Sequence, residues 1–249
     1  MKTVLVTGAN SGLGLATTIE VARRGFRSVG SVRSAAKAEV VATAAAAAGV
    51  EVEVVLLDVD DADRCAAVID ELRPWGLVNN AGFVDPHRVD EAGDDVAHRY
   101  LDTLLVSPMR LSRLAVPHMR EAGGGRIVQV SSISGRVTFP LLGWYQAAKH
   151  GLEAVSDALR MEVAGDGITV SIVEPGAFPS GSEDHVAYGW LRPLQSTTEQ
   201  VAKVIAGALT ARVPRARYVV GLDAKLNALS APFTPALVRD RALRIINRL

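Results

Sequence analysis

The chain of 249 residues contains a single cysteine, Cys65, which excludes an internal disulfide framework and fits a reducing compartment. Its five histidines are scattered and no two cysteines are paired, so no metal site is expected. Lys and Arg total 27, as do Asp and Glu, and this balance offers nucleic acid no overall basic field. No apolar run reaches the length of a membrane span or, at the N-terminus, of a signal-peptide core. These absences predict a cytoplasmic protein with neither nucleic acid nor a membrane as partner.

Alternating strand and helix patterns run through the whole sequence. Hydrophobic residues make up 49% and charged residues 22%, which suits a soluble enzyme with one substantial core. The alternation predicts a single α/β domain over residues 1–249, with a doubly wound, Rossmann-type parallel sheet of seven strands and helices on both faces. The expected strands are 2–7, 27–32, 51–57, 75–79, 126–131, 167–173 and 217–220. The expected helices are 15–24, 35–48, 61–73, 90–121, 144–164 and 197–212, the fourth bent or divided by Pro108 and Pro117.

A glycine-rich turn follows the first strand. Strand, turn and helix in this order bring backbone N–H groups and a helix N-terminus to an anionic phosphate. Gly8 would allow the tight turn, Gly12 the close approach of a pyrophosphate, and Gly14 the close packing of helix on strand. The expected dinucleotide contacts in this turn are Gly8, Asn10, Ser11, Gly12, Leu13 and Gly14.

The end of the second strand indicates which dinucleotide binds. A site specific for NAD usually carries Asp or Glu here, to accept hydrogen bonds from the adenosine ribose. This chain has Arg33 and Ser34 instead, with Lys37 one helical turn later. A guanidinium and a hydroxyl suit the 2′-phosphate of NADP, so we expect NADP(H) and regard NAD as the weaker candidate. The alternative is an exposed arginine that only opens a surface helix.

Three later strand ends complete the predicted cofactor site. Asp58 and Val59 follow the third strand, where the carboxylate would meet the adenine amino group or serve as a turn or cap residue. Asn79 and the segment Asn80-Ala81-Gly82 would brace neighbouring strands and pass close to the nicotinamide ribose, although Asn80 also suits a simple turn. Pro175, Gly176 and Ser180 would hold the nicotinamide carboxamide, and residues 178–196 are expected to form a substrate lid.

Ser132, Tyr145 and Lys149 are the candidate catalytic residues. Tyr145 and Lys149 are four residues apart, so on a helix they project from one face. An ammonium one turn away favours the phenolate and lowers a phenol pKa that is otherwise near ~10. Ser132, at the end of the fifth strand, could then hydrogen-bond a substrate oxygen. The alternative for the Tyr-Lys pair alone is an ordinary amphipathic helix with a buried tyrosine and a surface lysine.

Taken together, these motifs resemble the short-chain dehydrogenase/reductase family over essentially the whole chain. Three sequence segments are similar to those of the hydroxysteroid and retinol dehydrogenase-like branch: QVSSISGRVTFP, YQAAKHGLEAVSDALRME and RARYVVGLDAK. The resemblance implies Tyr145 as general acid/base, Lys149 as the residue that lowers its pKa and binds the nicotinamide ribose, and Ser132 as the residue that orients the substrate oxygen. It also implies a homodimer or homotetramer through the helices near 90–121 and 144–164.

One position departs from the family pattern. The family usually has an asparagine in the long helix, supporting a water that links the lysine to solvent, and here Leu104 aligns with it. A leucine side chain holds no water, so a backbone carbonyl suffices, the proton relay differs, or turnover is slow. The expected function is NADP(H)-dependent interconversion of a carbonyl and a secondary alcohol on a small to medium apolar substrate. The alternatives are a dinucleotide-binding sensor or scaffold with weak turnover, and epimerisation or dehydration on the same scaffold.

Overall fold

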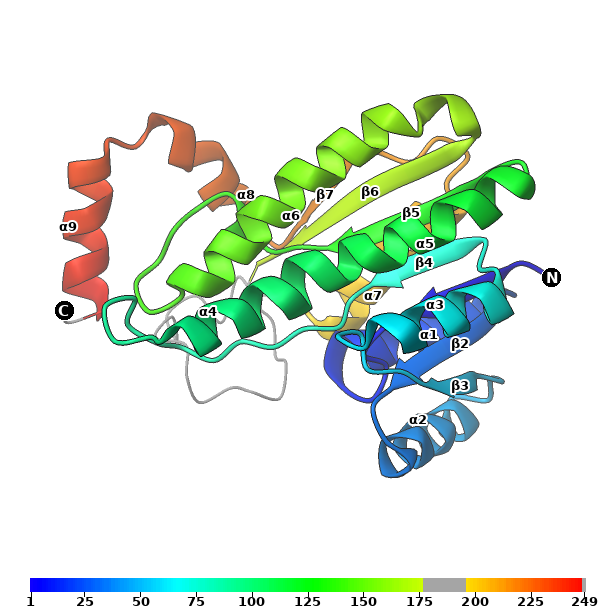
Figure 1. Ribbon diagram of the computed structural model, residues 1–249. Coiled ribbons are helices and arrows are strands. Elements are labelled where there is room, and N and C mark those ends of the chain that lie inside the picture. The colour runs from blue at the N-terminus through cyan, green and yellow to red at the C-terminus, as the bar shows by residue number, and fades with distance from the viewer. Residues whose placement is uncertain (177–195, 248–249) are drawn as a thin grey trace.

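The computed structural model describes residues 1–176 and 196–247, and it contains one parallel sheet of seven strands in the order β3-β2-β1-β4-β5-β6-β7. Figure 1 shows these strands side by side between two layers of helices. The fold predicted from the sequence is confirmed. The strands are β1 (Thr3–Val6), β2 (Arg27–Val32), β3 (Glu53–Leu56), β4 (Gly76–Asn79), β5 (Gly125–Val130), β6 (Ile168–Pro175) and β7 (Arg217–Val220).

Two layers of helices cover the two faces of the sheet, and two further helices follow β7 (Figure 1). The first layer holds α1 (Gly12–Arg23), α2 (Ala35–Ala47) and α7 (Thr198–Thr210). The second holds α3 (Ala62–Leu72), α4 (Asp94–Leu101), α5 (Ser107–Glu121) and α6 (Gly143–Glu162). The chain then continues through α8 (Leu222–Ser230) and α9 (Ala236–Asn247). None of the described helices is both long and apolar enough to span a membrane.

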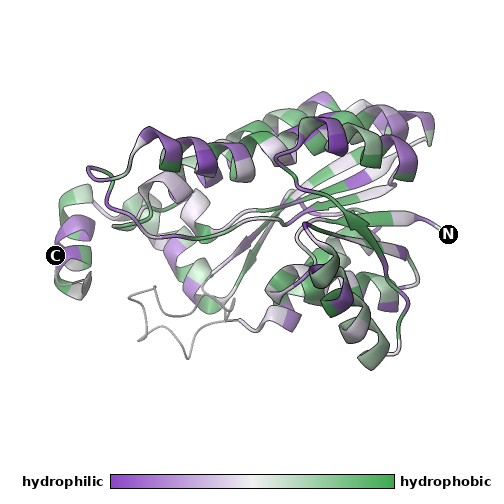
Figure 2. Cartoon of the chain, turned by 60° about the horizontal axis from the view of Figure 1, so that its bottom comes forward, coloured by the Kyte–Doolittle hydropathy of each residue, from purple (hydrophilic) through white to green (hydrophobic). Residues whose placement is uncertain are grey.

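Burial on both faces explains why the central strands are continuous apolar runs. In β1, Val4, Leu5 and Val6 are all fully buried. Leu5 packs on the α3 and α5 side, whereas Val4 and Val6 pack on the α1 and α7 side. Figure 2 shows the strands predominantly apolar, with hydrophilic residues concentrated on the helices.

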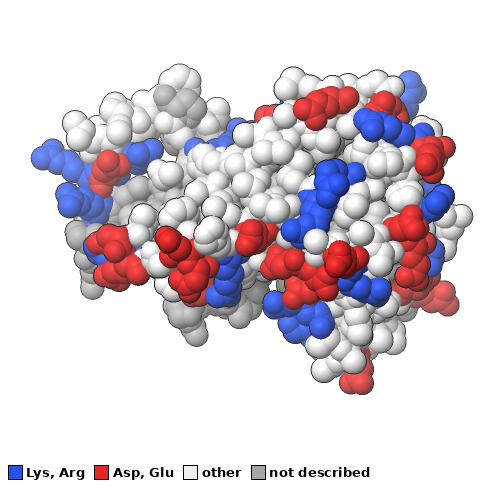
Figure 3. Space-filling view, viewed as in Figure 1, with Lys and Arg blue, Asp and Glu red and all other residues white. Residues whose placement is uncertain are grey.

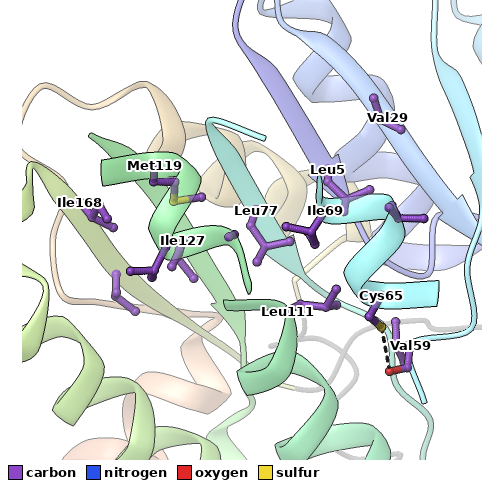
Figure 4. Packing of buried hydrophobic residues seen from close by; sticks show 14 of the residues in the cluster. Leu5, Val29, Val59, Cys65, Ile69, Leu77, Leu111, Met119, Ile127 and Ile168 are labelled. Carbon is purple, nitrogen blue, oxygen red and sulfur yellow. Dashed lines mark hydrogen bonds between the residues drawn. The ribbon is translucent and has the colours of Figure 1, made fainter. Parts of the chain in front are cut away.

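The larger core lies between the sheet and the α3–α5 layer. Leu77 of β4 and Ile127 of β5 pack there against Ile69 of α3 and Leu111 of α5 (Figure 4). Cys65 belongs to this core, where its thiol donates to the Val59 carbonyl oxygen at 3.3 Å and burial raises the pKa of the thiol. The single cysteine is therefore a packing residue.

The helix expected over 90–121 is divided, and it begins later than predicted. It begins at Asp94 and is interrupted by a wide π-helical turn, η1 (Asp102–Val106), in which the Ser107 N–H donates to the Asp102 carbonyl five residues earlier. Pro108, which follows, has no N–H for the carbonyl of Leu104, and this favours the wide turn. Pro117, in contrast, lies inside a continuous α5.

The carboxyl ends of the parallel strands converge on one edge of the sheet. The chain reverses its strand order between β1 and β4, which opens a crevice at that edge in folds of this kind. The segments beginning at Thr7, Arg33, Asp58, Asn80, Ser131 and Gly176 all leave the sheet there. This edge therefore gathers the residues that the sequence singled out.

Candidate functional site at the carboxyl edge of the sheet

The glycine turn after β1 is tightly packed at two of its three glycines. Gly8 and Gly12 have φ of 69° and 49°, a left-handed conformation that favours glycine. A Cβ on Gly14 would lie 2.1 Å from the Gly8 carbonyl oxygen and 2.6 Å from the Asn80 amide nitrogen. The turn is thus folded against the β4 loop, and α1 begins at Gly12, three residues earlier than the sequence predicted. Asn10, Ser11 and Leu13 lie within this same turn.

The segment after β4 is fixed to β1 by Thr7. The Thr7 hydroxyl accepts from the backbone N–H groups of Asn80 and Ala81, both at 2.9 Å, and the Asn80 side-chain amide donates to the Thr7 carbonyl. The amide of buried Asn79 donates instead to Pro108, Ser112 and Gln129, across to α5 and β5. These bonds fit the prediction that both amides brace neighbouring strands. Asn80 is more than a turn residue, because its side chain ties the loop to Thr7.

The adenosine end of the predicted site is open. Arg33 is exposed at the end of β2 and forms no ion pair or hydrogen bond with the described part of the chain. Ser34 is the N-cap residue of α2, yet its hydroxyl makes no capping bond. Asp58, also exposed, accepts from the Asp60 N–H in a local turn, whereas Asp61 is the residue that caps α3. Val59, next to Asp58, is buried.

At the opposite end, β6 finishes at Pro175 and is followed by Gly176. The Gly176 N–H donates to the Val220 carbonyl at 2.9 Å, and a Cβ on Gly176 would lie 2.2 Å from an Asp223 carboxylate oxygen. Asp223 is 3% exposed in the first turn of α8 and was not anticipated from the sequence. Ser180 and almost all of the predicted lid, 178–196, lie outside the described residues.

Ser132 opens the short 3-10 helix η2 (Ile133–Gly135). Its Oγ accepts from the Ser134 N–H at 3.1 Å, which leaves the hydroxyl hydrogen available for donation. The Ser132 hydroxyl also lies within hydrogen-bonding reach of the Tyr145 phenol and lowers its pKa. The loop between β5 and α6 therefore brings together two residues that are 13 positions apart.

Lys149 is buried beside Tyr145 on α6. Its Nζ lies 5.9 Å from the centroid of the Tyr145 ring and donates to the Val130 carbonyl at 2.8 Å. Burial lowers the pKa of Lys149 to about 8, while the nearby Glu153 carboxylate raises it. The surface lysine of the alternative interpretation is therefore wrong, because this side chain is 6% exposed.

The pKa of Tyr145 differs from the expectation. Burial raises it, and the Ser132 hydroxyl only partly offsets that effect. The ring packs edge-on against Tyr100, with centroids 6.4 Å apart, and Tyr100 is itself hydrogen-bonded to the backbone of Asp85. Desolvation thus outweighs the effect that the Tyr-x-x-x-Lys spacing suggested, and the phenol is held in its protonated form.

Leu104 is buried in the same cluster as Tyr145. It is 1% exposed and packs with Tyr100 and Ala148, and its Cδ2 would lie 2.8 Å from a Cβ on Gly82. A cavity lies beside it, with Lys149 and Asn79 in its wall. Its full lining is Thr7, Val59, Asn79, Ala81, Thr103, Leu104, Pro108, Leu111, Val130, Lys149 and Leu152.

The aromatic side chains that precede Tyr145 in the loop and in α6 divide between two clusters. Trp144 joins Tyr145 in the cluster around Tyr100, whereas Phe139 packs against Ile133 on the α8 side. Leu142 is the residue immediately before α6. Within the described residues, no group of three or more His, Cys, Asp or Glu side chains could hold a metal ion.

Known proteins resemble this chain in sequence and in fold. The model of the family described as short chain dehydrogenase matches residues 2–187. The chain belongs to the short-chain dehydrogenase family. Retinol dehydrogenase 16 of Mus musculus is 32% identical over 97% of this chain and 87% of that protein. The 17-beta-hydroxysteroid dehydrogenase type 6 of Rattus norvegicus is 29% identical over 99% and 89% of the two chains. The expected branch of the family is confirmed.

Solved short-chain dehydrogenases share the arrangement of the elements. A short-chain dehydrogenase from Streptomyces avermitilis superimposes with a TM-score of 0.81 at 31% identity, covering 98% of this chain and 94% of that one. A metagenomic short-chain oxidoreductase in complex with NADP gives a TM-score of 0.76 at 26% identity, covering 88% and 96%. This short-chain dehydrogenase therefore belongs to a family of oxidoreductases that use NAD(P).

Proposed function

We propose that this chain is an NADP(H)-dependent oxidoreductase that interconverts a carbonyl and a secondary alcohol on a small to medium apolar substrate. The observation that carries the proposal is the grouping of Ser132, Tyr145 and Lys149, on segments that leave the same sheet edge as the glycine turn. We call these three residues the proposed triad. The apolar surroundings of Tyr145, formed by Phe83, Tyr100 and Trp144, support an apolar substrate.

The residues of the carboxyl edge fit a dinucleotide. Only glycine is compatible with the close contact at Gly14, and the turn offers backbone N–H groups at the start of α1, where an anionic pyrophosphate is stabilised. Arg33 and Ser34 would hold the 2′-phosphate, and the Arg33 guanidinium, which has no ion-pair partner among the described residues, favours NADP(H) over NAD(H). The remaining contacts would come from Asp58, Val59, Asn80, Ala81, Gly82, Pro175, Gly176 and Ser180. When bound, the nicotinamide supplies or accepts the hydride.

Tyr145 would act on the substrate oxygen. Its raised pKa keeps the phenol protonated at neutral pH, so in carbonyl reduction it donates a proton to the oxygen as negative charge develops there. Ser132 would hold that oxygen by donating its O–H, since the Ser134 N–H already occupies part of the acceptor capacity of Oγ. Lys149 would bind the nicotinamide ribose and stabilise the phenolate that remains after the proton transfer.

The test is oxidation of NADPH with a panel of ketones and aldehydes, with NADH run in parallel. We expect turnover by the wild type and a loss of about 10²–10⁴-fold in Tyr145→Phe, the usual contribution of a general acid. NADPH binding, followed by its fluorescence, should survive in Tyr145→Phe because the phenyl ring still packs against Tyr100. A Tyr145→Phe enzyme as active as the wild type would contradict the proposed role.

The cofactor preference is tested by Arg33→Ala. Removing the guanidinium should weaken NADPH binding by roughly 10-fold or more, in line with a charge-assisted bond to phosphate, and leave NADH binding unchanged. The matched control is Arg23→Ala, because Arg23 is exposed at the far end of α1 and away from the carboxyl edge. Equal losses for both cofactors would assign Arg33 to the surface helix instead.

A further inference from the structure

Behind the proposed triad, four side chains of alternating charge are joined by ion pairs. Arg136 binds the Glu174 carboxylate with Nε and Nη2, at 2.7 and 2.8 Å. The same carboxylate accepts from Arg217 Nε at 3.0 Å, and Arg217 Nη2 donates to Glu153 at 2.8 Å. Arg217 also binds Asp157, one helical turn after Glu153 on α6, at 2.7 and 2.9 Å. We call Arg136, Glu174, Arg217 and Glu153 the ion-pair chain. It links the η2 loop, β6, β7 and α6 in that order.

The two ends of the ion-pair chain lie next to the proposed triad. Arg136 comes four residues after Ser132, and Glu153 comes one helical turn after Lys149 on α6. Glu153 also touches the η2 turn directly: a Cβ on Gly135 would lie 2.9 Å from Glu153 Cγ and 2.8 Å from Ser131 Oγ. The ion-pair chain thus connects the loop that carries Ser132 to the helix that carries the other two residues.

The ion-pair chain is shielded from water at its centre. The Glu174 side chain is fully buried and that of Glu153 is 8% exposed, whereas the two arginines are about a third exposed or less. Burial and the nearby Glu153 raise the pKa of Glu174, and Arg136 and Arg217 lower it. Because a buried charge that loses its partner is strongly destabilising, each pair holds its elements in one geometry.

We propose that the ion-pair chain positions the proposed triad, holding the Ser132 loop at a fixed distance from Tyr145 and Lys149. The inference rests on the proposed function, since it assigns the ion-pair chain a role in the same reaction. None of its four residues reaches the substrate oxygen in this role. They act by fixing the position of Ser132 relative to Tyr145 and Lys149. That position decides whether the Tyr145 phenol and the Ser132 hydroxyl can reach the same substrate oxygen.

The main variants are Glu153→Gln and Arg136→Met, which remove a charge at each end of the ion-pair chain. A misplacement of about 1 Å costs up to about 100-fold in rate, so we expect kcat to fall roughly 10- to 100-fold in each. KM for NADPH should stay within about twofold, because the glycine turn and Arg33 lie on other elements. The double variant should lose little more than either single one, since both act on one unit.

Two further variants separate positioning from general stability. Gly135→Ala keeps all four charges but places a Cβ against Glu153 and Ser131, and it should lower kcat in the same range. Glu53→Gln removes the exposed Arg27–Glu53 pair on β2 and β3, far from the η2 loop, and should leave kcat unchanged. Thermal unfolding of each variant shows which ones retain the fold at the assay temperature.

The pH profile gives a readout that a purely structural role would not move. The charged and titratable groups around Lys149 are Tyr145 and Glu153 on α6. Behind Glu153 lie Arg217 of β7, which also binds Asp157 of α6, and Glu174 of β6. In Glu153→Gln, Lys149 loses the carboxylate that raises its pKa, so its ammonium gives up the proton at lower pH. The phenolate of Tyr145 is then less stabilised, so the acidic limb of alcohol oxidation should move to higher pH.

Amide hydrogen exchange decides the proposal even without turnover. Residues 132–137 should exchange faster in Glu153→Gln and Arg136→Met than in the wild type, and at the wild-type rate in Glu53→Gln. A wild type inactive with every carbonyl tested would overturn the proposed function while leaving this readout intact. Full activity and unchanged exchange in both end variants would overturn the positioning role.

Discussion

Lys149 combines deep burial with a charge that the site needs. Its ammonium has one hydrogen bond to the described residues, to the Val130 carbonyl, and its side chain is almost removed from water. Burial lowers its pKa from the ordinary 10.5 to about 8, so the protonated form is less stable in the folded than in the unfolded chain. At neutral pH the residue therefore destabilises the fold while providing a cation beside Tyr145.

This conflict predicts a pH-dependent stability for Lys149→Met. Between pH 8 and 10.5 the unfolded chain binds more protons than the folded one, so wild-type stability gains from Lys149 as pH rises. Lys149→Met should exceed the wild type in free energy of unfolding by the largest amount below pH 8. This difference should decline by up to about 3 kcal/mol toward pH 10.5. Urea titrations at several pH values measure it, with the exposed Lys203→Met as control. A difference that stays flat over this range would contradict it.

Leu104→Asn is the second prediction at the level of single residues. The position is buried against Gly82 and Ala148, beside the cavity that Lys149 lines. An amide there could support a proton relay from Lys149, so we expect turnover to be preserved or raised. Stability should fall by about 1–3 kcal/mol, because a polar group replaces a packed leucine. Steady-state kinetics and thermal unfolding test both parts, and a large loss of activity in a folded variant would show that this position is misassigned.

Among the elements, the glycine turn is the one least able to accept a side chain. We predict that Gly14→Ala abolishes NADPH binding and lowers stability, because its Cβ would collide with the Gly8 carbonyl oxygen at 2.1 Å. Gly165→Ala is the control, since a Cβ there meets no atom within 4 Å. Cofactor titration and thermal unfolding of both variants provide the comparison. Unchanged NADPH affinity in Gly14→Ala would remove the turn from the binding site.

The strands were predictable because burial on both faces leaves a clear signature. β2 and β5 are each followed by a polar residue, Arg33 and Ser131, and their observed bounds lie within one residue of those predicted. At β3, an edge strand, the prediction was too long at both ends, since a strand with one neighbour has fewer backbone partners. The glycine turn was readable for a similar reason: its geometry excludes side chains, so its sequence is constrained.

The remaining features depend on contacts between distant residues. Arg136, Glu174 and Arg217 are separated by about 40 positions each, and nothing in their local sequence indicates that they meet. The same is true of Asp223, which lies against Gly176 from another element. The wide turn at η1 was also not predictable beyond a bend at Pro108, because α and π turns differ by one hydrogen-bond position rather than by residue type.

For the whole molecule, the outer face of α6 predicts self-association. Ala147, Ala154 and Met161 recur every seven residues and are exposed, and Val155 beside them is 42% exposed. Figure 3 shows few charges where α5 and α6 cross this face. We propose a homodimer or homotetramer through this helix and expect Ala154→Arg to shift the protein to smaller species in light scattering. Ala46→Arg, on the exposed side of α2, should not. A wild type that is monomeric at micromolar concentration would defeat the proposal.

The wide turn at η1 also bears on how this chain tolerates change in length. Deleting one residue from Asp102–Val106 would restore ordinary α-helical spacing, and the helix itself would lose little. Closing the wide turn to α-helical spacing without removing a residue would instead rotate α4 by about 100° relative to α5, the angle that one residue spans in an α-helix. Tyr100 would turn away from Tyr145 and from the backbone of Asp85. The extra residue of η1 therefore keeps the Tyr100 wall of the proposed site in register with α5.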